Sequence, residues 1–261
     1  MLKDNQAVSN VISTVILTSV LIIITIASSF FANQTLTTNI ENVQFDQAIN
    51  TVLSVEKIAR NMMFEPYATA SVSTSFSTTD PYIVESGNLT VLINGVKQVS
   101  FLANYFKILG GPNVGVPFIK DYVGNNSLML IGFGGTISHI HTYQSNGAWV
   151  SLDYDRIRCV YSGVAQFHND TGFGLYNVVE ITIVKLIAGE LTEFERSRVI
   201  IENTGIETNQ LEYTGNPTIK IQLSGIGDFS VNLSELGGNI DYPTLINLAV
   251  VCLKISVLGG G

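Results

Sequence analysis

Two histidines separated by one residue are the first side chains in this sequence that could do chemistry. His139 and His141 stand in the segment "TISHIHTYQ", and residues two apart on a strand point to the same face of a sheet. Two imidazoles on one face could chelate a metal ion, and His168, the only other histidine, would have to join them from elsewhere together with a carboxylate. We prefer the interpretation that they are ordinary surface or cross-strand histidines, and we predict no metal site.

An acidic pair follows in the segment "DYDRIR". If this segment is a strand, Asp153 and Asp155 lie on one face, and Arg156 and Arg158 lie on the other. Paired carboxylates can bind calcium, but two are too few for an ion that takes six to eight oxygen ligands. The segment is therefore expected to be a solvated strand face.

Two further motifs have more ordinary explanations than catalysis. Asp170-Thr171-Gly172 matches the tripeptide of aspartic proteases, whose site needs two carboxylates that share a proton, and the chain contains no second such tripeptide. "NDTGFG" is instead typical of a turn between two strands. The glycine-rich segments "GFGG" and "GGPNVG" lack the lysine and the following helix of a phosphate-binding loop. We predict no catalytic residue and no cofactor, and we expect that the protein is not an enzyme.

The elements that position these residues are expected to be short strands. From Thr69 onward, alternating or apolar runs are separated by turns rich in glycine and asparagine, as in "TIKIQLSGIGDFSVNLS". This pattern is typical of an antiparallel sandwich-like or barrel-like domain. We place this β domain at residues 66–258 and a short tail at residues 259–261.

The two cysteines lie in separate predicted strands. Cys159 and Cys252 could form a disulfide if the domain is exported, and closing so long a loop would contribute roughly 4–5 kcal/mol. The alternative is two buried free thiols, since cysteine often acts as a small core residue.

The first 65 residues have a different pattern from the β domain. No residue between Asp4 and Glu41 is charged, and residues 8–32 are enough to cross about 30 Å of hydrocarbon. The run is too long for a cleaved secretory signal. We therefore expect a leader at residues 1–6, a transmembrane helix at residues 7–32 and an amphipathic helix at residues 33–65. The fold class is α+β. Lys3 favours a cytoplasmic N-terminus, with the β domain outside the cell.

The second part of this helix has a single apolar face, which predicts that a globular domain packs against it. Pro66 disfavours helical geometry at the residue before it, so the helix is expected to end near Phe64. The apolar positions at helical spacing are Ile40, Val43, Phe45, Ala48, Ile49, Val52, Val55, Ala59 and Met62.

Small and hydroxyl-bearing residues follow one side of the transmembrane part. Such residues let helices approach closely in a membrane. In the alternative, each hydroxyl bonds the carbonyl four residues earlier while it faces lipid. The helix-packing residues predicted in this way are Thr14, Thr18, Thr25, Ser29 and Ala32.

Composition excludes one class of partner and suits an exported surface. The formal net charge is −8, which argues against nucleic acid because DNA and RNA binders need a basic stripe. Charged residues make up only 13% of the chain, about half the usual share. The predicted N-glycosylation sequons start at Asn33, Asn88, Asn125, Asn169 and Asn232.

The segment "AVSNVISTVILTSVLIIITIA" resembles the N-terminal segment of archaeal type IV pilins. The family pattern A/G-V-S-x-V-I-x-T-x-x-L is matched by Ala7, Val8, Ser9, Val11, Ile12, Thr14 and Leu17. The resemblance implies that a prepilin peptidase removes the leader before Ala7 at the cytoplasmic face. It also implies that the remaining helix packs into the core of a filament.

Two hypotheses for function remain open. In the first, the chain is a structural subunit of an archaeal surface filament, and its partners are other copies or other pilin-like subunits. In the second, it is a single-span surface protein whose leader is retained. Its β domain then binds an S-layer, a glycan or a filament. The second is favoured by "DNQ" before Ala7, where family leaders carry basic residues.

Overall fold

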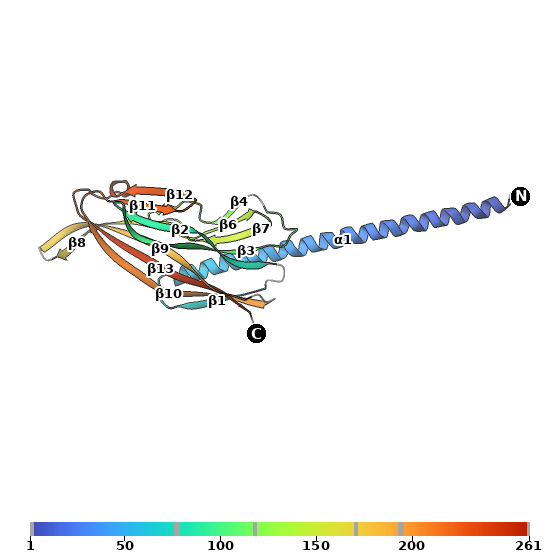
Figure 1. Cartoon of the computed structure of the whole chain (residues 1–261), viewed down its shortest axis with the longest axis horizontal. Coiled ribbons are helices and arrows are strands. Elements are labelled where there is room, and N and C mark those ends of the chain that lie inside the picture. Colours follow the sequence, from blue (N-terminus) through green and yellow to red (C-terminus); the bar gives the residue numbers. More distant parts are fainter. Residues whose placement is uncertain (1–2, 76–78, 117–118, 170–171, 193–195, 260–261) are drawn as a thin grey trace.

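The protein consists of one long helix followed by a domain of β-strands (Figure 1). The computed structural model describes residues 3–75, 79–116, 119–169, 172–192 and 196–259. Helix α1 runs without interruption over Lys3–Met62, 60 residues, which corresponds to about 90 Å. The α+β fold class and the continuous helix are therefore confirmed. Residues 3–6 of the expected leader belong to α1, whereas residues 1–2 lie outside the described part.

The strands of the β domain run from just after the helix to the end of the described chain. Strand β13 includes Gly259, the first residue of the expected tail, and residues 260–261 lie outside the described part. The elements are β1 (Thr69–Ser75), β2 (Asp80–Ile93), β3 (Val96–Leu109), β4 (Ile119–Val123), β5 (Met129–Ile131), β6 (His139–Gln144), β7 (Ala148–Asp153), β8 (Ile157–Asn169), β9 (Gly172–Leu191), β10 (Arg196–Tyr213), β11 (Thr218–Leu223), β12 (Gly227–Asn232), the 3-10 helix η1 (Leu233–Leu236) and β13 (Thr244–Gly259).

These strands form two sheets in the described part of the chain. Sheet A has the order β1-β10-β13-β9-β8-β5, and sheet B has the order β12-β11-β2-β3-β7-β6-β4. Most neighbours are antiparallel, as predicted, but β13 pairs with β9 and β5 pairs with β8 in parallel. The parallel pairs were not predicted, because side-chain alternation is the same for both strand directions.

Two hairpins predicted from turn residues are present. Strands β11 and β12 pair from Thr218 opposite Asn232 to Leu223 opposite Gly227. Strands β8 and β9 pair up to Asn169 opposite Gly172. The predicted turn of the "NDTGFG" segment falls between these two strand ends, and its residues 170–171 lie outside the described part.

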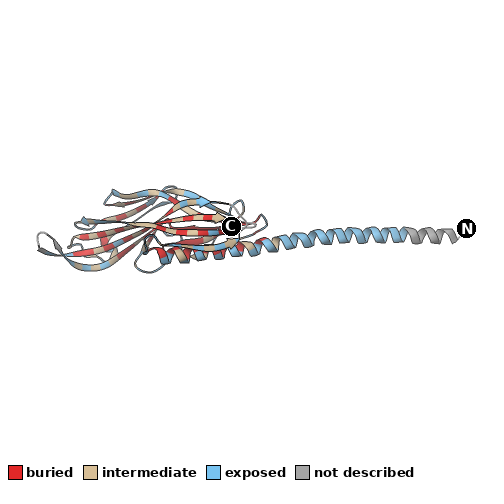
Figure 2. Ribbon diagram, turned by 90° about the horizontal axis from the view of Figure 1, so that it is seen from below, coloured by how far each residue is buried: buried red, intermediate tan, exposed pale blue. Residues whose placement is uncertain are grey.

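The hydrophobic core has two parts, and the helix takes part in only one of them. Figure 2 shows buried residues on the strands and on the part of α1 that lies against the β domain, whereas the part of the helix outside the domain is exposed. In the part without the helix, the two sheets pack directly on each other, with residues such as Val91 and Ile221 of sheet B against Ile181 and Leu248 of sheet A. In the other part, the C-terminal half of α1 packs against both sheets. The helix therefore acts as a structural element of the β domain.

Seven of the nine apolar positions predicted for the docked face of α1 are buried, among them Val52 and Val55, which are fully buried. The prediction is wrong for Ile40 and Val43, which are 46% and 58% exposed. These two residues lie on the side of the helix that the domain does not cover.

Polar contacts complete the docking of α1. The Glu41 carboxylate accepts hydrogen bonds from the backbone N–H and the side-chain amide of Asn113, at 2.7 and 3.1 Å. Further along the helix, Ser138 Oγ donates to Glu56 Oε1 at 2.8 Å. At the end of the helix, Asn203 Nδ2 donates to the Met62 carbonyl at 2.8 Å, which satisfies a backbone group that has no partner within the helix.

Glycines let the chain pass close to the helix where α1 enters the domain. A Cβ atom on Gly110 would lie 2.6 Å from the ring of Phe45, and one on Gly111 would lie 2.6 Å from the carboxyl carbon of Glu41. The first two glycines of "GGPNVG" therefore allow close packing against α1.

Candidate functional site

Two surfaces of the molecule carry the predicted functional residues, and the first is the N-terminal half of α1. From Ile12 to Thr37 every residue is exposed in the single chain, and the large apolar side chains point in all directions around the helix. Among the described residues, α1 is the one helix that is long and apolar enough to cross a membrane. Such a surface is stable only in lipid or against other protein.

The predicted packing stripe lies within this exposed half. Thr18, Thr25 and Ser29 donate their hydroxyls to carbonyls four residues earlier, at 2.8–2.9 Å. In the single chain these hydroxyls therefore have the partners that the alternative interpretation requires. The stripe remains a prediction about contacts between chains, in which small side chains would allow close approach.

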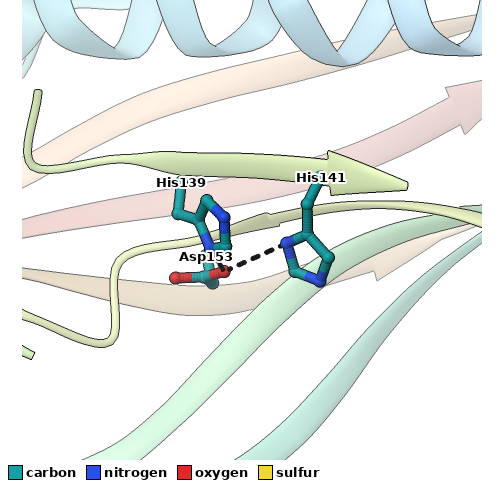
Figure 3. A group of neighbouring side chains, drawn as sticks. All are labelled: His139, His141 and Asp153. Atoms are coloured by element: carbon teal, nitrogen blue, oxygen red, sulfur yellow. Dashed lines mark ion pairs between the residues drawn. The ribbon is translucent and has the colours of Figure 1, made fainter. Parts of the chain in front are cut away.

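The second surface is a cluster of histidine and aspartate side chains on sheet B. His139 and His141 lie on the same face of β6, with their rings stacked at a centroid distance of 4.4 Å. Asp153 ends β7, where the strand register pairs it with His139. Its Oδ2 lies 3.2 Å from His139 Nδ1 and 3.8 Å from His141 Nδ1, so the carboxylate lies beside both rings (Figure 3).

Two outer contacts hold this cluster in place. His139 Nε2 lies 2.8 Å from Asp121 Oδ1 of β4. The other oxygen of Asp153, Oδ1, accepts a hydrogen bond from Arg156 Nη2 at 2.7 Å, and Arg156 also donates to the Asn125 carbonyl. In the second histidine, the ring nitrogen His141 Nδ1 is buried and has no hydrogen-bond partner.

The environment differs from the one expected from sequence. His139 is 5% exposed, so it is not a surface histidine; it lies across the strands from Asp153, which is the other form that the preferred interpretation allowed. The expectation for "DYDRIR" is wrong, because β7 ends at Asp153 and β8 begins at Ile157 in the other sheet. Asp153, Asp155 and Arg156 are buried at this crossing and do not form a solvated strand face.

The pKa shifts follow from burial and from the charges in contact. Burial opposes protonation of His139, but hydrogen bonds with Asp153 and Asp121 raise its pKa above the ordinary value. Burial lowers the pKa of His141, and the charge of His139 lowers it further. Burial works against ionisation of Asp153, but His139 and Arg156 lower its pKa.

Asp155 behaves in the opposite way to Asp153. Burial and the nearby charge of Asp153 raise the pKa of Asp155 to about 6, although Ser86 Oγ donates to its Oδ2 at 2.8 Å. Two carboxylates two residues apart therefore differ in pKa because only Asp153 has cationic partners in direct contact.

A cavity opens beside the cluster. Its volume is about 260 Å³, and its lining includes Tyr105, Asp121, Leu128 and Ile226 as well as the cluster itself. An aromatic row continues along the same face of sheet B, with His141 stacked on Tyr143 at 5.5 Å. The site thus combines two imidazoles and three carboxylates beside an accessible space.

The sequence analysis did not predict that Asp153 and Asp121 contact His139. A signal for Asp153 was present, because the segment "SNG" predicts a turn, and strand residues equally distant from Asn146 pair across it. This rule places His139 opposite Asp153, as observed. No comparable local signal joins Asp121, since 15 residues separate β4 from β6, and they include strand β5 of the other sheet.

The cysteine pair does not form the disulfide that the sequence allowed. Cys159 and Cys252 are both free and buried. Cys159 lies on β8 and Cys252 on β13, and β9 runs between these strands. Two strand spacings amount to about 10 Å, which exceeds the Cα separation of roughly 4.4–6.8 Å that a disulfide allows. The second interpretation, two free core thiols, describes them.

The predicted glycosylation sites differ in accessibility. Asn33, Asn88 and Asn125 are exposed, and Asn33 lies on α1 itself. Asn232 is half-buried, and its Oδ1 accepts a hydrogen bond from Thr218 Oγ1 at 2.7 Å. The side chain of Asn169 lies outside the described part, and glycosylation remains a prediction at all five positions.

Comparison of the chain with protein families, with curated proteins and with solved structures found no match.

Proposed function

We propose that this chain is a structural subunit of a pilin-like filament on the surface of an archaeal cell. In this arrangement the N-terminal halves of α1 from many copies form the core, and the β domains form the outer surface. The N-terminus begins on the cytoplasmic side, and a prepilin peptidase removes the leader before Ala7.

The observation that carries the proposal is that exposed apolar residues continue along one side of α1 beyond the part that could span a membrane. Beyond the membrane-length segment, Leu36, Ile40 and Val43 are exposed. At about 100° of rotation per residue, these three fall within an arc of about 80° that also contains all five residues of the predicted packing stripe. One uncharged side of the helix, with small and hydroxyl-bearing residues in the stripe and apolar residues after it, therefore extends from Thr14 to Val43.

This side points away from the β domain. The docked residues from Phe45 to Met62 centre about 150° around the helix from the stripe. After Val43 the same side becomes polar, with Gln47, Asn50 and Ser54 exposed. Copies that join through the stripe would thus place every β domain on the outside of the bundle.

A simple membrane anchor does not account for this extension. An anchor needs about 20 apolar residues, and the charged residue Glu41 already lies beyond that length. Exposed apolar residues past the bilayer instead suit contact with neighbouring helices.

A lysine at Val43 tests the proposal. Because Val43 is 58% exposed, Val43→Lys should leave the β domain folded and the chain in the membrane. It should abolish filaments seen by electron microscopy of the cell surface. Asn42→Lys is the matched control, since Asn42 is exposed on another side of the helix, and its filaments should persist. Normal filaments in the Val43→Lys variant, or purified filaments that lack this chain, would refute the proposal.

The alternative is a retained single-span protein whose β domain binds an S-layer, a glycan or a filament. The aromatic row beside His141 favours it, because Lys107, Tyr105 and Tyr143 line a second cavity of about 330 Å³ on sheet B. Mass spectrometry of the mature N-terminus separates the two proposals. An N-terminus at Ala7 or Val8 supports the filament subunit, whereas an intact Met1 supports the anchored protein.

A further inference from the structure

We infer that His139, His141 and Asp153 form a binding site for one divalent transition-metal ion, with Zn²⁺ as the ion to test. The site is independent of filament assembly, because it lies on sheet B of the β domain. One ligand atom from each residue lies within 4.8 Å of the other two. Ligands at about 2.0–2.2 Å from a zinc ion lie roughly 3.3–3.5 Å from one another, so small side-chain rotations would close the site.

The hydrogen bonds of the nitrogen and oxygen atoms that would not bind the metal support the assignment. In metal sites the ring nitrogen of histidine that does not bind metal commonly donates to a carboxylate, which fixes the orientation of the ring. His139 Nε2 has this partner in Asp121 Oδ1 at 2.8 Å. Asp153 Oδ1 is likewise held by Arg156 at 2.7 Å. This leaves His139 Nδ1 and Asp153 Oδ2 as the two free ligand atoms, 3.2 Å apart, which is close to the spacing of two ligands on one zinc ion.

The third ligand lacks the partner that its burial requires. His141 Nδ1 is buried without a hydrogen bond, although buried polar atoms nearly always have a partner. It lies 3.8 Å from Asp153 Oδ2, which is too long for a hydrogen bond. A metal ion between the two atoms would satisfy both.

The chemistry of the ligands selects the class of ion. Two imidazoles and one carboxylate suit zinc, nickel or copper, whereas calcium and magnesium prefer sites made of oxygen ligands. Asp121, Asp153 and Asp155 outnumber the single cation Arg156 around the cavity, which favours a positive ion. Three protein ligands leave a fourth position for water, on the side of the 260 Å³ cavity.

Zinc binding to the full chain tests the inference. Untagged protein in detergent is stripped with a chelator, dialysed and titrated with ZnCl₂ by isothermal titration calorimetry. We expect one Zn²⁺ per chain. His141→Phe keeps a ring stacked between His139 and Tyr143 but removes a ligand, so the affinity should fall at least 100-fold.

Two further variants make the test specific. Asp121→Asn changes only the outer partner of His139 at a half-exposed side chain, and it should weaken binding roughly 10–100-fold. His168→Phe removes the one histidine outside the pair and should bind zinc like the parent. Fluorescence of Trp149 checks that each variant is folded. The inference is overturned if the folded parent binds no zinc, or if His141→Phe binds as tightly as the parent.

Discussion

The two halves of α1 are built from the same regular helix but have opposite surroundings. The C-terminal half has one apolar face, and both sheets cover it. The N-terminal half is apolar on all sides, and nothing in the single chain covers it. The two halves therefore have different roles. The C-terminal half stabilises the β domain, whereas the apolar surface of the N-terminal half has to be buried in lipid or against neighbouring chains.

The largest effect on stability should appear when two separate variants are compared, each with one charge placed in one half of α1. Val52→Asp puts a carboxylate where no water reaches, and we expect the β domain to lose more than about 4 kcal/mol of stability. Ile23→Asp changes a residue that is 66% exposed and should leave that stability unchanged. It should instead weaken membrane insertion by about 3 kcal/mol.

Two measurements separate these effects. Unfolding in denaturant, followed by Trp149 fluorescence of the detergent-solubilised chain, reports on the β domain, and the membrane-bound fraction reports on insertion. If both variants lowered the unfolding midpoint equally, the two halves would not differ in role.

The next effect concerns the end of the docked half. Asn203 is fully buried and donates to the Met62 carbonyl, which also accepts the Glu65 N–H. Asn203→Ala removes one of these two hydrogen bonds and also the acceptor of the Gly205 N–H, and it should cost up to about 3 kcal/mol. Asn209→Ala, at an exposed position on the same strand, should change the stability by less than about 0.5 kcal/mol. Equal unfolding midpoints for the two variants would show that this cap does not secure the helix.

A smaller effect is expected where the chain crosses the helix at the entrance to the domain. Gly110→Ala would bring a methyl group within 2.6 Å of the Phe45 ring, and the resulting overpacking should cost about 2 kcal/mol. Gly115→Ala meets no atom within 4 Å and serves as the control in the same denaturation experiment. A neutral Gly110→Ala would mean that the boundary between the docked and free halves is loosely packed.

The smallest effect tests the first polar contact of the docked half. Glu41→Gln replaces one of the two oxygens that accept hydrogen bonds from Asn113 with an amide group that cannot accept, and it should cost about 1 kcal/mol. Asp46→Asn, at an exposed position nearby, should have no measurable effect. Should both variants unfold at the same denaturant concentration, docking would begin after Glu41.

Much of the fold could be predicted because the signals are local. The uncharged run and the three- and four-residue spacing predicted the helix, and the turn residues predicted the hairpins β8–β9 and β11–β12. The exposure of Ile40 and Val43 could not be predicted, because periodicity identifies an apolar face and not the extent of the domain that covers it.

The histidine cluster was predicted only in part, for a related reason. Alternation along one strand placed His139 and His141 on one face, as observed. The other members of the cluster are Asp153, Asp121 and Arg156, which come from β7, β4 and the crossing between the sheets. Those contacts depend on strand order and register, which a single-strand pattern does not contain.

The sequence by itself determined the length of α1, its apolar side and the strand-rich nature of the domain. Hydrogen bonds four residues apart and alternation every two residues act within a segment, so the segment alone specifies them. Only the tertiary structure decided that β9 separates Cys159 from Cys252, that sheets cover one half of the helix, and that two histidines meet an aspartate. These outcomes join residues far apart in the chain, where packing of the whole domain selects the partners.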